Sequence, residues 1–444
     1  MTSWRGAAYG SRTMAEYFVV EGGHPLRGTV RPAGNKNAAL PMIAATLMAD
    51  GASTLHNVPR IRDVDILLQI VSELGATTEW IGPNTVRIDP AGLAQRALDP
   101  VLCARLRASI LLAGPLLARF GEVTMPPPGG DVIGRRRLDT HFLAFERLGV
   151  SVDIGDQFRL TTPGLTGADI FLDEPSVTAT ENALMAAVRA RGATTLRNAA
   201  CEPHVQDLAQ GLLAMGARIE GIGTNRLVID GVDALRGAEM TVGPDHIEVG
   251  SFIGLAAVTD GDLTIEGVRG ADLQPILLPF DRLGVRPTLD GDRLHIASSQ
   301  ERRVRTDVGG YIPKIEDGPW PAFPADLTSI AIVVATQCDG IVMIFEKMFE
   351  SRLFFVDKVI GLGARAVLCD PHRVVVSGPS ALTGGTVESP DIRAGMAILL
   401  AALAATGVST IHNIRQIDRG YERIDARLRD LGAQIERKGE RESP

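Results

Sequence analysis

Apolar residues recur along this chain at helical spacing in long stretches, and each stretch is followed by a short segment of alternating character. Four aligned examples are MIAATLMADGASTLHNV, LMAAVRARGATTLRNA, IGLAAVTDGDLTIEGV and LLAALAATGVSTIHNI. Each predicts a buried helix that ends at a glycine, and then a short strand such as STLHN, TTLRN or STIHN. A second helix follows, as in DVDILLQIVSELGA or ERIDARLRDLGA, and leads to another strand such as TTEWIG or QIERK.

The ending of the second helix recurs along the chain and reveals an internal repeat. The recurring glycines are Gly75, Gly149, Gly216, Gly284, Gly363 and Gly432. Their spacing of about 70 residues indicates one duplicated unit of mixed helix and strand that covers nearly everything after Met14. Six such units are too long for one hydrophobic core, so we expect two domains of three units each, with helices buried against sheets.

Composition favours an ordinary enzyme and excludes several other classes. Of the 444 residues, 45% are apolar and 22% are charged, and the formal net charge is −8. An acidic chain argues against general nucleic-acid binding, so any anionic ligand must be held by a local group of cations. No apolar stretch is long and uninterrupted enough for a membrane span, and the N-terminus lacks an apolar signal segment. We therefore expect a cytoplasmic protein, with residues 1–13 as a disordered extension or an upstream start before Met14.

The cysteines and histidines predict no metal centre. Cys103, Cys201, Cys338 and Cys369 lie far apart, with neither metal spacing nor a C-x-x-C pattern. The histidines are scattered and form no H-E-x-x-H motif. We expect a reducing compartment, in which these cysteines act as small core residues.

A polar or charged residue stands near the predicted start of the long helix in every unit. These residues are Lys36, Arg107, Thr178, His246, Asp326 and Arg393. A cation at a helix N-terminus opposes the helix dipole, at a cost of about 0.3–1 kcal/mol. The cost disappears if an anion lies between the cation and the free backbone N–H groups. Accidental placement is the alternative, but three cations in equivalent places favour an anion site.

The stretch PPPGGDVIGRRRLDTH, residues 126–141, has the composition of a loop. It is either a solvated surface loop or a lid, stiff at its prolines and free at Gly129, Gly130 and Gly134. Arg136 offers a planar fork for a carboxylate or phosphate. An incoming anion would raise the pKa of Asp131, which could then donate a proton.

Seven motifs resemble those of one enzyme family, in the family's order and spacing. They are GNKNAALP, LRASILLAGPL, PGGDVIGRR, PAFPAD, FESR, DIRAG and IDRGYERI. The chain resembles the enolpyruvyl transferases, and within them the branch that uses a sugar nucleotide, from about Met14 to Glu436. The resemblance implies an α/β fold, an inside-out α/β barrel of two domains with three βαβαββ repeats each. It places residues 14–35 with 243–444 in one domain, and 36–242 with a mobile loop at 126–137 in the other.

The resemblance also implies a reaction between the two domains. The enolpyruvyl group of phosphoenolpyruvate moves to the 3′-hydroxyl of UDP-N-acetylglucosamine with release of phosphate, the first committed step of peptidoglycan synthesis. No cofactor, metal, nucleic acid, membrane or obligate protein partner is implied. The implied ligands of phosphoenolpyruvate are Lys36, Asn37, Arg136, Arg393 and Arg419. The implied catalytic residues are Lys36, Asp131, Asp326 and Asp391, and those beside the sugar nucleotide are Arg107, Ser176, Asp326 and Arg352.

Several of these residues have a simpler structural interpretation. Asp326 and Asp391 have the residue type and position of helix N-caps. Arg419 could form a salt bridge at a helix start, and Arg352 could be a surface charge. Arg135 and Arg137 are expected to be solvated or bound to a distant phosphate, and Cys201 and His204 to be structural.

The chain departs from the family pattern at several positions. Most members have cysteine where Asp131 stands here, and fosfomycin alkylates that cysteine, so we expect insensitivity to fosfomycin because a carboxylate is a poor nucleophile. The other departures gather around the acceptor, at Thr178, Cys201, His204, His246 and Ala325. They leave open a transferase with another nucleotide or sugar acceptor, or a silent paralogue that binds a sugar nucleotide. A shikimate-pathway transferase is disfavoured by the GGDVIG loop and the IDRGYERI ending.

Overall fold

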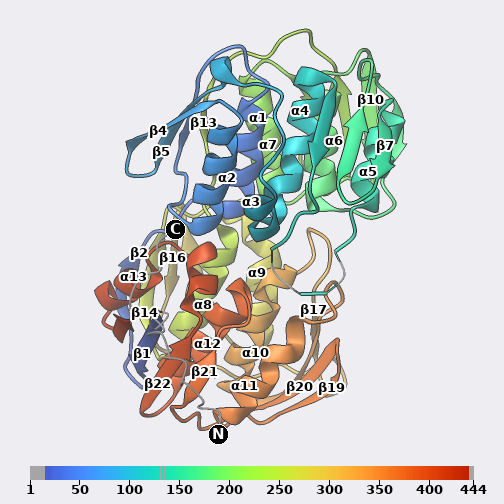
Figure 1. The fold of residues 1–444 in the computed structure, drawn as a ribbon. Helices are drawn as coiled ribbons and strands as arrows, with labels where there is room; N and C mark the ends of the chain where they lie inside the picture. Colours follow the sequence, from blue (N-terminus) through green and yellow to red (C-terminus); the bar gives the residue numbers. More distant parts are fainter. Residues whose placement is uncertain (1–15, 131–132, 135, 440–444) are drawn as a thin grey trace, which may run out of the picture.

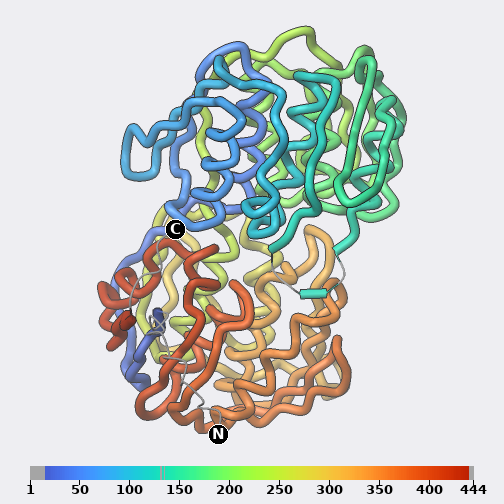
Figure 2. The backbone as a smooth tube through the Cα atoms, viewed as in Figure 1, coloured from blue at the N-terminus to red at the C-terminus, as the bar shows by residue number. Residues whose placement is uncertain are grey.

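The protein folds into two domains, each around its own hydrophobic core (Figure 1). The computed structural model describes residues 16–130, 133–134 and 136–439. One core takes its apolar residues from between Ala38 and Val242, and the other from Phe18–Val30 together with Ile247–Ile435. The blue N-terminal strands accordingly lie in the orange-to-red domain, as the tube in Figure 2 shows. The domain limits at residues 36 and 243 stay a prediction, which this division of the cores supports.

Strands of the described part of the chain form six sheets, three around each core. In the first domain the sheets contain β13 (Glu239–Thr241), β3 (Ser53–His56), β5 (Thr85–Asp89) and β4 (Thr77–Gly82); β6 (Glu122–Met125), β8 (Phe158–Thr161) and β7 (Ser151–Ile154); and β9 (Asp169–Phe171), β10 (Ala193–Arg197), β12 (Arg226–Asp230) and β11 (Arg218–Glu220). In the second domain they contain β2 (Arg27–Val30), β14 (Asp262–Glu266), β16 (Arg293–Ile296) and β15 (Thr288–Asp290); β17 (Lys314–Glu316), β18 (Gly340–Phe345), β20 (Arg373–Gly378) and β19 (Ala366–Asp370); and β21 (Thr386–Glu388), β22 (Val408–His412), β1 (Tyr17–Glu21) and β23 (Gln434–Lys438).

The order of strands within the sheets confirms the internal repeat. Every four-stranded sheet has one parallel pair followed by two antiparallel pairs, as in β13–β3–β5–β4. The sheet β6–β8–β7 keeps only the two antiparallel pairs. A parallel pair requires a crossover connection, and the long helix of each unit supplies it.

The first helix of each unit lies inside its domain. These helices are α1 (Lys36–Thr46), η2 (Arg107–Leu112) with α4 (Ala113–Phe120), α6 (Val177–Ala187), α8 (His246–Val258), η4 (Ala325–Leu327) with α10 (Thr328–Thr336), and α12 (Ile392–Ala404). All 13 residues of α8 are buried, and α8, α10 and α12 pack against one another. A helix that is apolar all round must be covered on every side, so the sheets lie outside it. The predicted inside-out arrangement is confirmed.

The second helices lie nearer the surface and complete each unit. They are α2 (Arg62–Glu73), α5 (Asp139–Arg147), α7 (Pro203–Ala214), α9 (Gln274–Arg282), α11 (Val356–Gly361) and α13 (Ile424–Asp430). The remaining short helices are η1 (Pro90–Gly92), α3 (Pro100–Arg105), η3 (Gly270–Asp272), η5 (Arg352–Phe355) and η6 (Ile414–Arg419).

Glycines end the second helices as predicted, whereas among the first helices α4 is capped by Gly121 but α1 stops before its glycine. The six repeat glycines all have positive φ, from 74° at Gly284 to 106° at Gly216 and Gly363, as a glycine just past a helix end requires. By contrast, α1 ends at Thr46, well before Gly51, because its last N–H groups bond to carbonyls three residues back in a tight turn. The prediction that the long helices run up to their glycines is therefore wrong by a few residues at α1.

Candidate active site

Asp326 lies in the second domain where the starts of η4, η5 and α12 meet. Its Oδ2 accepts a hydrogen bond from Nε of Arg393 at 2.9 Å, and its Oδ1 accepts one from Nη2 of Arg352 at 3.1 Å. Burial favours the neutral acid, but the two guanidinium groups outweigh it and hold the pKa of Asp326 well below its usual range. Asp326 is not a helix cap, since Pro324 stands in that position, and Arg352 is only 3% exposed. Both structural alternatives for these residues are wrong.

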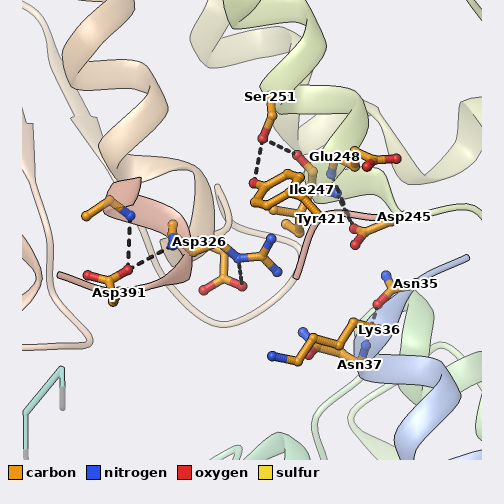
Figure 3. Close-up of polar contacts among 12 residues, drawn as sticks. Asn35, Lys36, Asn37, Asp245, Ile247, Glu248, Ser251, Asp326, Asp391 and Tyr421 are labelled. Atoms are coloured by element: carbon orange, nitrogen blue, oxygen red, sulfur yellow. Dashed lines mark hydrogen bonds and ion pairs between the residues drawn. The ribbon is translucent and has the colours of Figure 1, made fainter. Parts of the chain in front are cut away.

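Asp391 is the N-cap of α12. Its Oδ1 accepts hydrogen bonds from the backbone N–H groups of Arg393 at 2.8 Å and Ala394 at 3.0 Å (Figure 3). The N-cap interpretation is confirmed. The cap fixes the start of α12, and with it the backbone from which Arg393 reaches Asp326.

A second cluster joins the two domains around Asp63, which the sequence analysis did not single out. Its Oδ2 lies 2.6 Å from Nζ of Lys36, and its Oδ1 lies 2.9 Å from Nε of Arg419. Lys36 begins α1 and Asp63 lies in the first turn of α2, both in the first domain, whereas Arg419 ends η6 of the second. Burial would raise the pKa of Asp63, but the two cations lower it. Arg419 is therefore an interdomain contact and not a salt bridge at its own helix start.

A sequence signal for Asp63 does exist. Asp63, Leu67 and Ile70 share one face of α2, and all three are buried. A carboxylate on the apolar face of an amphipathic helix needs a buried partner. The identity of that partner could not be read from the spacing.

Lys36 connects the Asp63 cluster to Asp326. Its charge contributes to the lowered pKa of Asp326, and Figure 3 shows Lys36 and Asn37 on α1 facing the side where Asp326 and Asp391 lie. The start of α1 is held by Asn35, whose side chain accepts a hydrogen bond from the backbone of Asn37 at 2.8 Å. Three of the four cations that were predicted to meet, Lys36, Arg393 and Arg419, are therefore brought together.

Arg136 belongs to the segment that was predicted to be a lid. Nη2 of Arg107 donates to the carbonyl oxygens of Arg136 at 2.9 Å and Arg137 at 3.1 Å, and so holds the end of this segment. Burial and the neighbouring Arg136 lower the pKa of Arg107 to about 10. The backbone N–H of Ser351 donates to the carbonyl of Ile133 at 3.3 Å, so the segment touches the second domain next to Arg352. Asp131 and Arg135 lie outside the described residues.

Arg137 points away from this cluster. Its guanidinium pairs with Asp173 at 2.7 Å and with Asp139 at 3.2 Å, and its side chain is 39% exposed. These contacts are those of a partly solvated surface charge.

Ser176 and Thr178 lie at the start of α6. Ser176 is the N-cap, and its Oγ accepts from the backbone of Ala179 at 3.4 Å. Nδ2 of Asn182 lies 3.0 Å from Nδ1 of His141, whose Nε2 lies 3.1 Å from the hydroxyl of Thr178. Because an amide nitrogen only donates, Nδ1 of His141 accepts and its Nε2–H donates to Thr178.

Three of the other departures from the family pattern, Cys201, His204 and His246, pack around Trp320 where the chain crosses between domains. The rings of His204 and His246 stack with centroids 6.1 Å apart, and His246 contacts Trp320 edge-on at 5.7 Å. Nδ2 of Asn35 lies 3.2 Å from Nδ1 of His246, and Sγ of Cys201 donates to the carbonyl of Trp320 at 3.6 Å. These contacts favour the structural interpretation of Cys201 and His204.

The described part of the chain has neither a cluster of metal ligands nor a membrane-spanning helix. Within residues 16–439, apart from 131–132 and 135, no three His, Cys, Asp or Glu side chains converge as metal ligands would. No helix in those ranges is long and apolar enough to cross a membrane.

The arrangement suits a small, highly charged anion. Lys36 and Arg419 are held by the buried carboxylate of Asp63, and Arg393 is held by the half-buried carboxylate of Asp326. Fixed cations in a water-poor site replace the hydration of a bound anion without further reorganisation. The carboxylate of Asp326 lies between the guanidinium groups of Arg393 and Arg352.

The comparisons with known proteins agree with this geometry. The family model of EPSP synthase (3-phosphoshikimate 1-carboxyvinyltransferase) matches residues 20–428. The UDP-N-acetylglucosamine 1-carboxyvinyltransferase of Bradyrhizobium diazoefficiens is 60% identical over 426 residues, covering 96% of this chain and 99% of the relative. The enzyme of the same name from Treponema denticola is 53% identical over 421 residues, covering 95% of this chain and 99% of the relative.

Solved structures show the same architecture. The enolpyruvyl transferase NikO from Streptomyces tendae superposes with a TM-score of 0.85 at 26% identity, covering 96% of this chain and 99% of that one. An EPSP synthase from Acinetobacter baumannii superposes with a TM-score of 0.73 at 18% identity, covering 96% and 100% of the two chains, which shows the fold alone. With a family model that matches nearly the whole chain, relatives above 50% identity and this site between two domains, the chain belongs to the enolpyruvyl transferase family.

Proposed function

We propose that this protein is a UDP-N-acetylglucosamine 1-carboxyvinyltransferase, which moves the enolpyruvyl group of phosphoenolpyruvate to the 3′-hydroxyl of the sugar nucleotide. The relatives that carry this name support it, because their identity of 60% and 53% extends over nearly the full chain. The observation that carries the proposal is Asp326 paired with Arg393 and influenced by Lys36, a base and an anion site in one place.

Phosphoenolpyruvate binds to Lys36, Asn37, Arg136, Arg393 and Arg419. Asp63 now neutralises Lys36 and Arg419, and Asp326 neutralises Arg393. The incoming phosphate and carboxylate compete for these same donors. The cations that hold the two aspartates ionised are therefore partly engaged by the substrate.

This competition activates Asp326 as a base. With its pKa held low, Asp326 accepts a proton poorly. When the substrate engages Arg393, the pKa of Asp326 rises, and the carboxylate takes the proton of the 3′-hydroxyl as that oxygen attacks C2 of phosphoenolpyruvate. Asp131 delivers a proton to C3, which gives a tetrahedral ketal phosphate. Loss of phosphate and of a C3 proton then leaves the enolpyruvyl ether.

The sugar nucleotide lies along Arg107, Ser176 and Arg352. Arg107 also donates hydrogen bonds to the carbonyl groups of residues 136 and 137, so the same side chain contacts the nucleotide and the segment predicted to be a lid. Asp391 acts as an orienting group, because its cap sets the position of Arg393.

Release of phosphate from phosphoenolpyruvate, measured with UDP-N-acetylglucosamine and with other uridine nucleotides, tests the proposal. We expect turnover with UDP-N-acetylglucosamine, and a loss of about 10²–10⁴-fold in kcat for Asp326→Asn, the range for a general base. The matched control is Asp290→Asn, because Asp290 is exposed at the end of β15. Turnover that is faster with another nucleotide would reject the acceptor, and unchanged activity of Asp326→Asn would reject the mechanism.

A different acceptor is the second candidate, and the network at Thr178 favours it. The hydroxyl of Thr178, oriented by His141, stands at the start of α6, and Thr178 is one of the departures from the family pattern. A silent paralogue would bind the sugar nucleotide and release no phosphate.

The cellular role follows from the reaction. We propose that the enzyme works in the cytoplasm in peptidoglycan synthesis, and that its reaction needs no metal or redox cofactor, because it only exchanges carbon–oxygen bonds.

A further inference from the structure

Two buried carboxyl groups lie on the far side of Arg352 from Asp326. Asp317 follows β17 and Glu346 follows β18, and both are fully buried. Oε1 of Glu346 accepts backbone hydrogen bonds from Met348 at 3.3 Å and Phe349 at 3.1 Å, and Asp317 accepts one from the backbone of Lys347. Neither group has a role in the reaction proposed above.

Arg352 lies between Glu346 and Asp326. Its Nη2 donates to Oδ1 of Asp326 at 3.1 Å, and its Nε lies 3.8 Å from Oε2 of Glu346. Nε and Nη1 of Arg352 and Oε2 of Glu346 have no aligned hydrogen-bond partner among the residues described. The guanidinium is thus hydrogen-bonded to Asp326, and it faces Glu346 across 3.8 Å without an aligned hydrogen bond.

Two adjacent buried carboxyl groups do not both ionise readily. Burial raises the pKa of Glu346 to about 9. The positive charge of Arg352 lowers this pKa, and the neighbouring Asp317 raises it. The other charged or titratable groups around this cluster are Arg393, Asp391 and His372, whose Nδ1 lies 2.7 Å from the backbone carbonyl of Glu346. Near neutral pH, Glu346 is therefore uncharged, and Arg352 forms its ion pair with Asp326 and not with Glu346.

We propose that Glu346 is a positioning residue for the transfer reaction: its neutral carboxyl keeps Arg352 on Asp326, and its ionised form draws Arg352 away. The kinetic part of this inference rests on the proposed function. The residue touches no substrate and acts through Arg352 alone.

Two substitutions separate charge from packing. Glu346→Gln keeps the acceptor for the backbone of Met348 and Phe349 and cannot ionise, whereas Glu346→Ala removes the group. We expect Glu346→Ala to lower kcat up to about 100-fold with little change in KM, as for a displaced catalytic group. We expect kcat of the parent to decline above about pH 9, and Glu346→Gln should restore most of the loss and flatten that decline. The matched control, Glu388→Gln, is exposed on β21 and should change neither property.

A measurement of stability tests the same point without substrate. The unfolded carboxyl ionises near pH 4.3, while the folded one stays neutral to about pH 9, so the folded state holds an extra proton between these values. The stability of the parent relative to Glu346→Gln must therefore fall as pH rises through this window. A difference in Tm that grows from pH 5 to pH 9 is expected.

The outcomes are distinguishable. A parent without turnover would reject the proposed function and leave the stability result to decide on Glu346. A flat difference in Tm, or a Glu346→Gln variant as slow as Glu346→Ala, would overturn the role proposed for Glu346.

Discussion

Asp63 gives the sharpest test of how the protein holds its cations before substrate binds. The carboxylate is 2% exposed and lies 2.6 Å from Lys36 Nζ and 2.9 Å from Arg419 Nε, in the other domain. The substitution Asp63→Asn keeps the shape and removes the charge. Removing one partner of a buried ion pair costs about 3–5 kcal/mol, and since the two cations are 11% and 14% exposed, we expect about 3 kcal/mol here.

The same substitution should strengthen anion binding. In the parent, an anion has to compete with Asp63 for Lys36 and Arg419, whereas in Asp63→Asn both cations lack their internal partner. We expect inorganic phosphate to bind the variant at least about tenfold more tightly, which corresponds to about 1.4 kcal/mol. Isothermal titration calorimetry with phosphate at low salt measures this, and urea unfolding measures the loss of stability.

The control is Asp65→Asn, because Asp65 lies in the same turn of α2 but is exposed. It should change neither the stability nor the phosphate affinity by more than a few tenths of a kcal/mol. If Asp63→Asn binds phosphate more weakly than the parent, Asp63 orients the cations for the anion and does not compete with it. The reasoning about competition would then be refuted, and with it the proposed activation of Asp326.

Three further predictions concern the segment predicted to be a lid and the crossing between the domains. Fosfomycin should leave activity unchanged on prolonged incubation, and Asp131→Cys should introduce time-dependent inactivation; inactivation of the parent would contradict the assignment of Asp131. Arg107→Ala should lower kcat/KM about tenfold or more, because the carbonyl groups of residues 136 and 137 lose their donor, and steady-state kinetics against Arg105→Ala provides the comparison. Burial lowers the pKa of His204 to about 3. As pH falls below about 6.5, this histidine is protonated in the unfolded chain but not in the folded one, so the folded state loses stability between about pH 6.5 and pH 3. His204→Phe should lose less stability over that range in thermal unfolding, and an unchanged pH slope would show that His204 is not the titrating group.

The fold was predictable in its main features because its signals are local. Helical spacing of apolar residues and the glycine after each second helix depend on neighbours within a few turns, and the positive φ at Gly75 and Gly432 confirms the latter. The ends of the long helices were less predictable. At α1 the tight turn after Thr46, and not the later Gly51, decides where the helix stops.

The site was only partly predictable, for a related reason. Lys36, Asp326 and Arg393 follow from motifs at helix starts, but the choice between N-cap and ion pair for Asp326 needed its actual neighbours. Asp63 carries a signal in its place on the apolar face of α2, but its partners cannot be read from that spacing. Glu346 was missed because the adjacent sequence does not separate it from surface carboxylates. Their properties come from partners that approach only in the folded chain.

The amino-acid sequence by itself determined the sixfold unit, the buried helices and the cations placed at their starts. Each of these depends on the periodicity and spacing of residues over short stretches. Only the tertiary structure decided which charges neutralise one another. Asp63 and Arg419 are 356 residues apart in the chain and lie in different domains, yet they form one buried pair. Such pairing depends on the distance between the charges and on their burial. Both are set by the packing of the two domains and cannot be read from the local sequence.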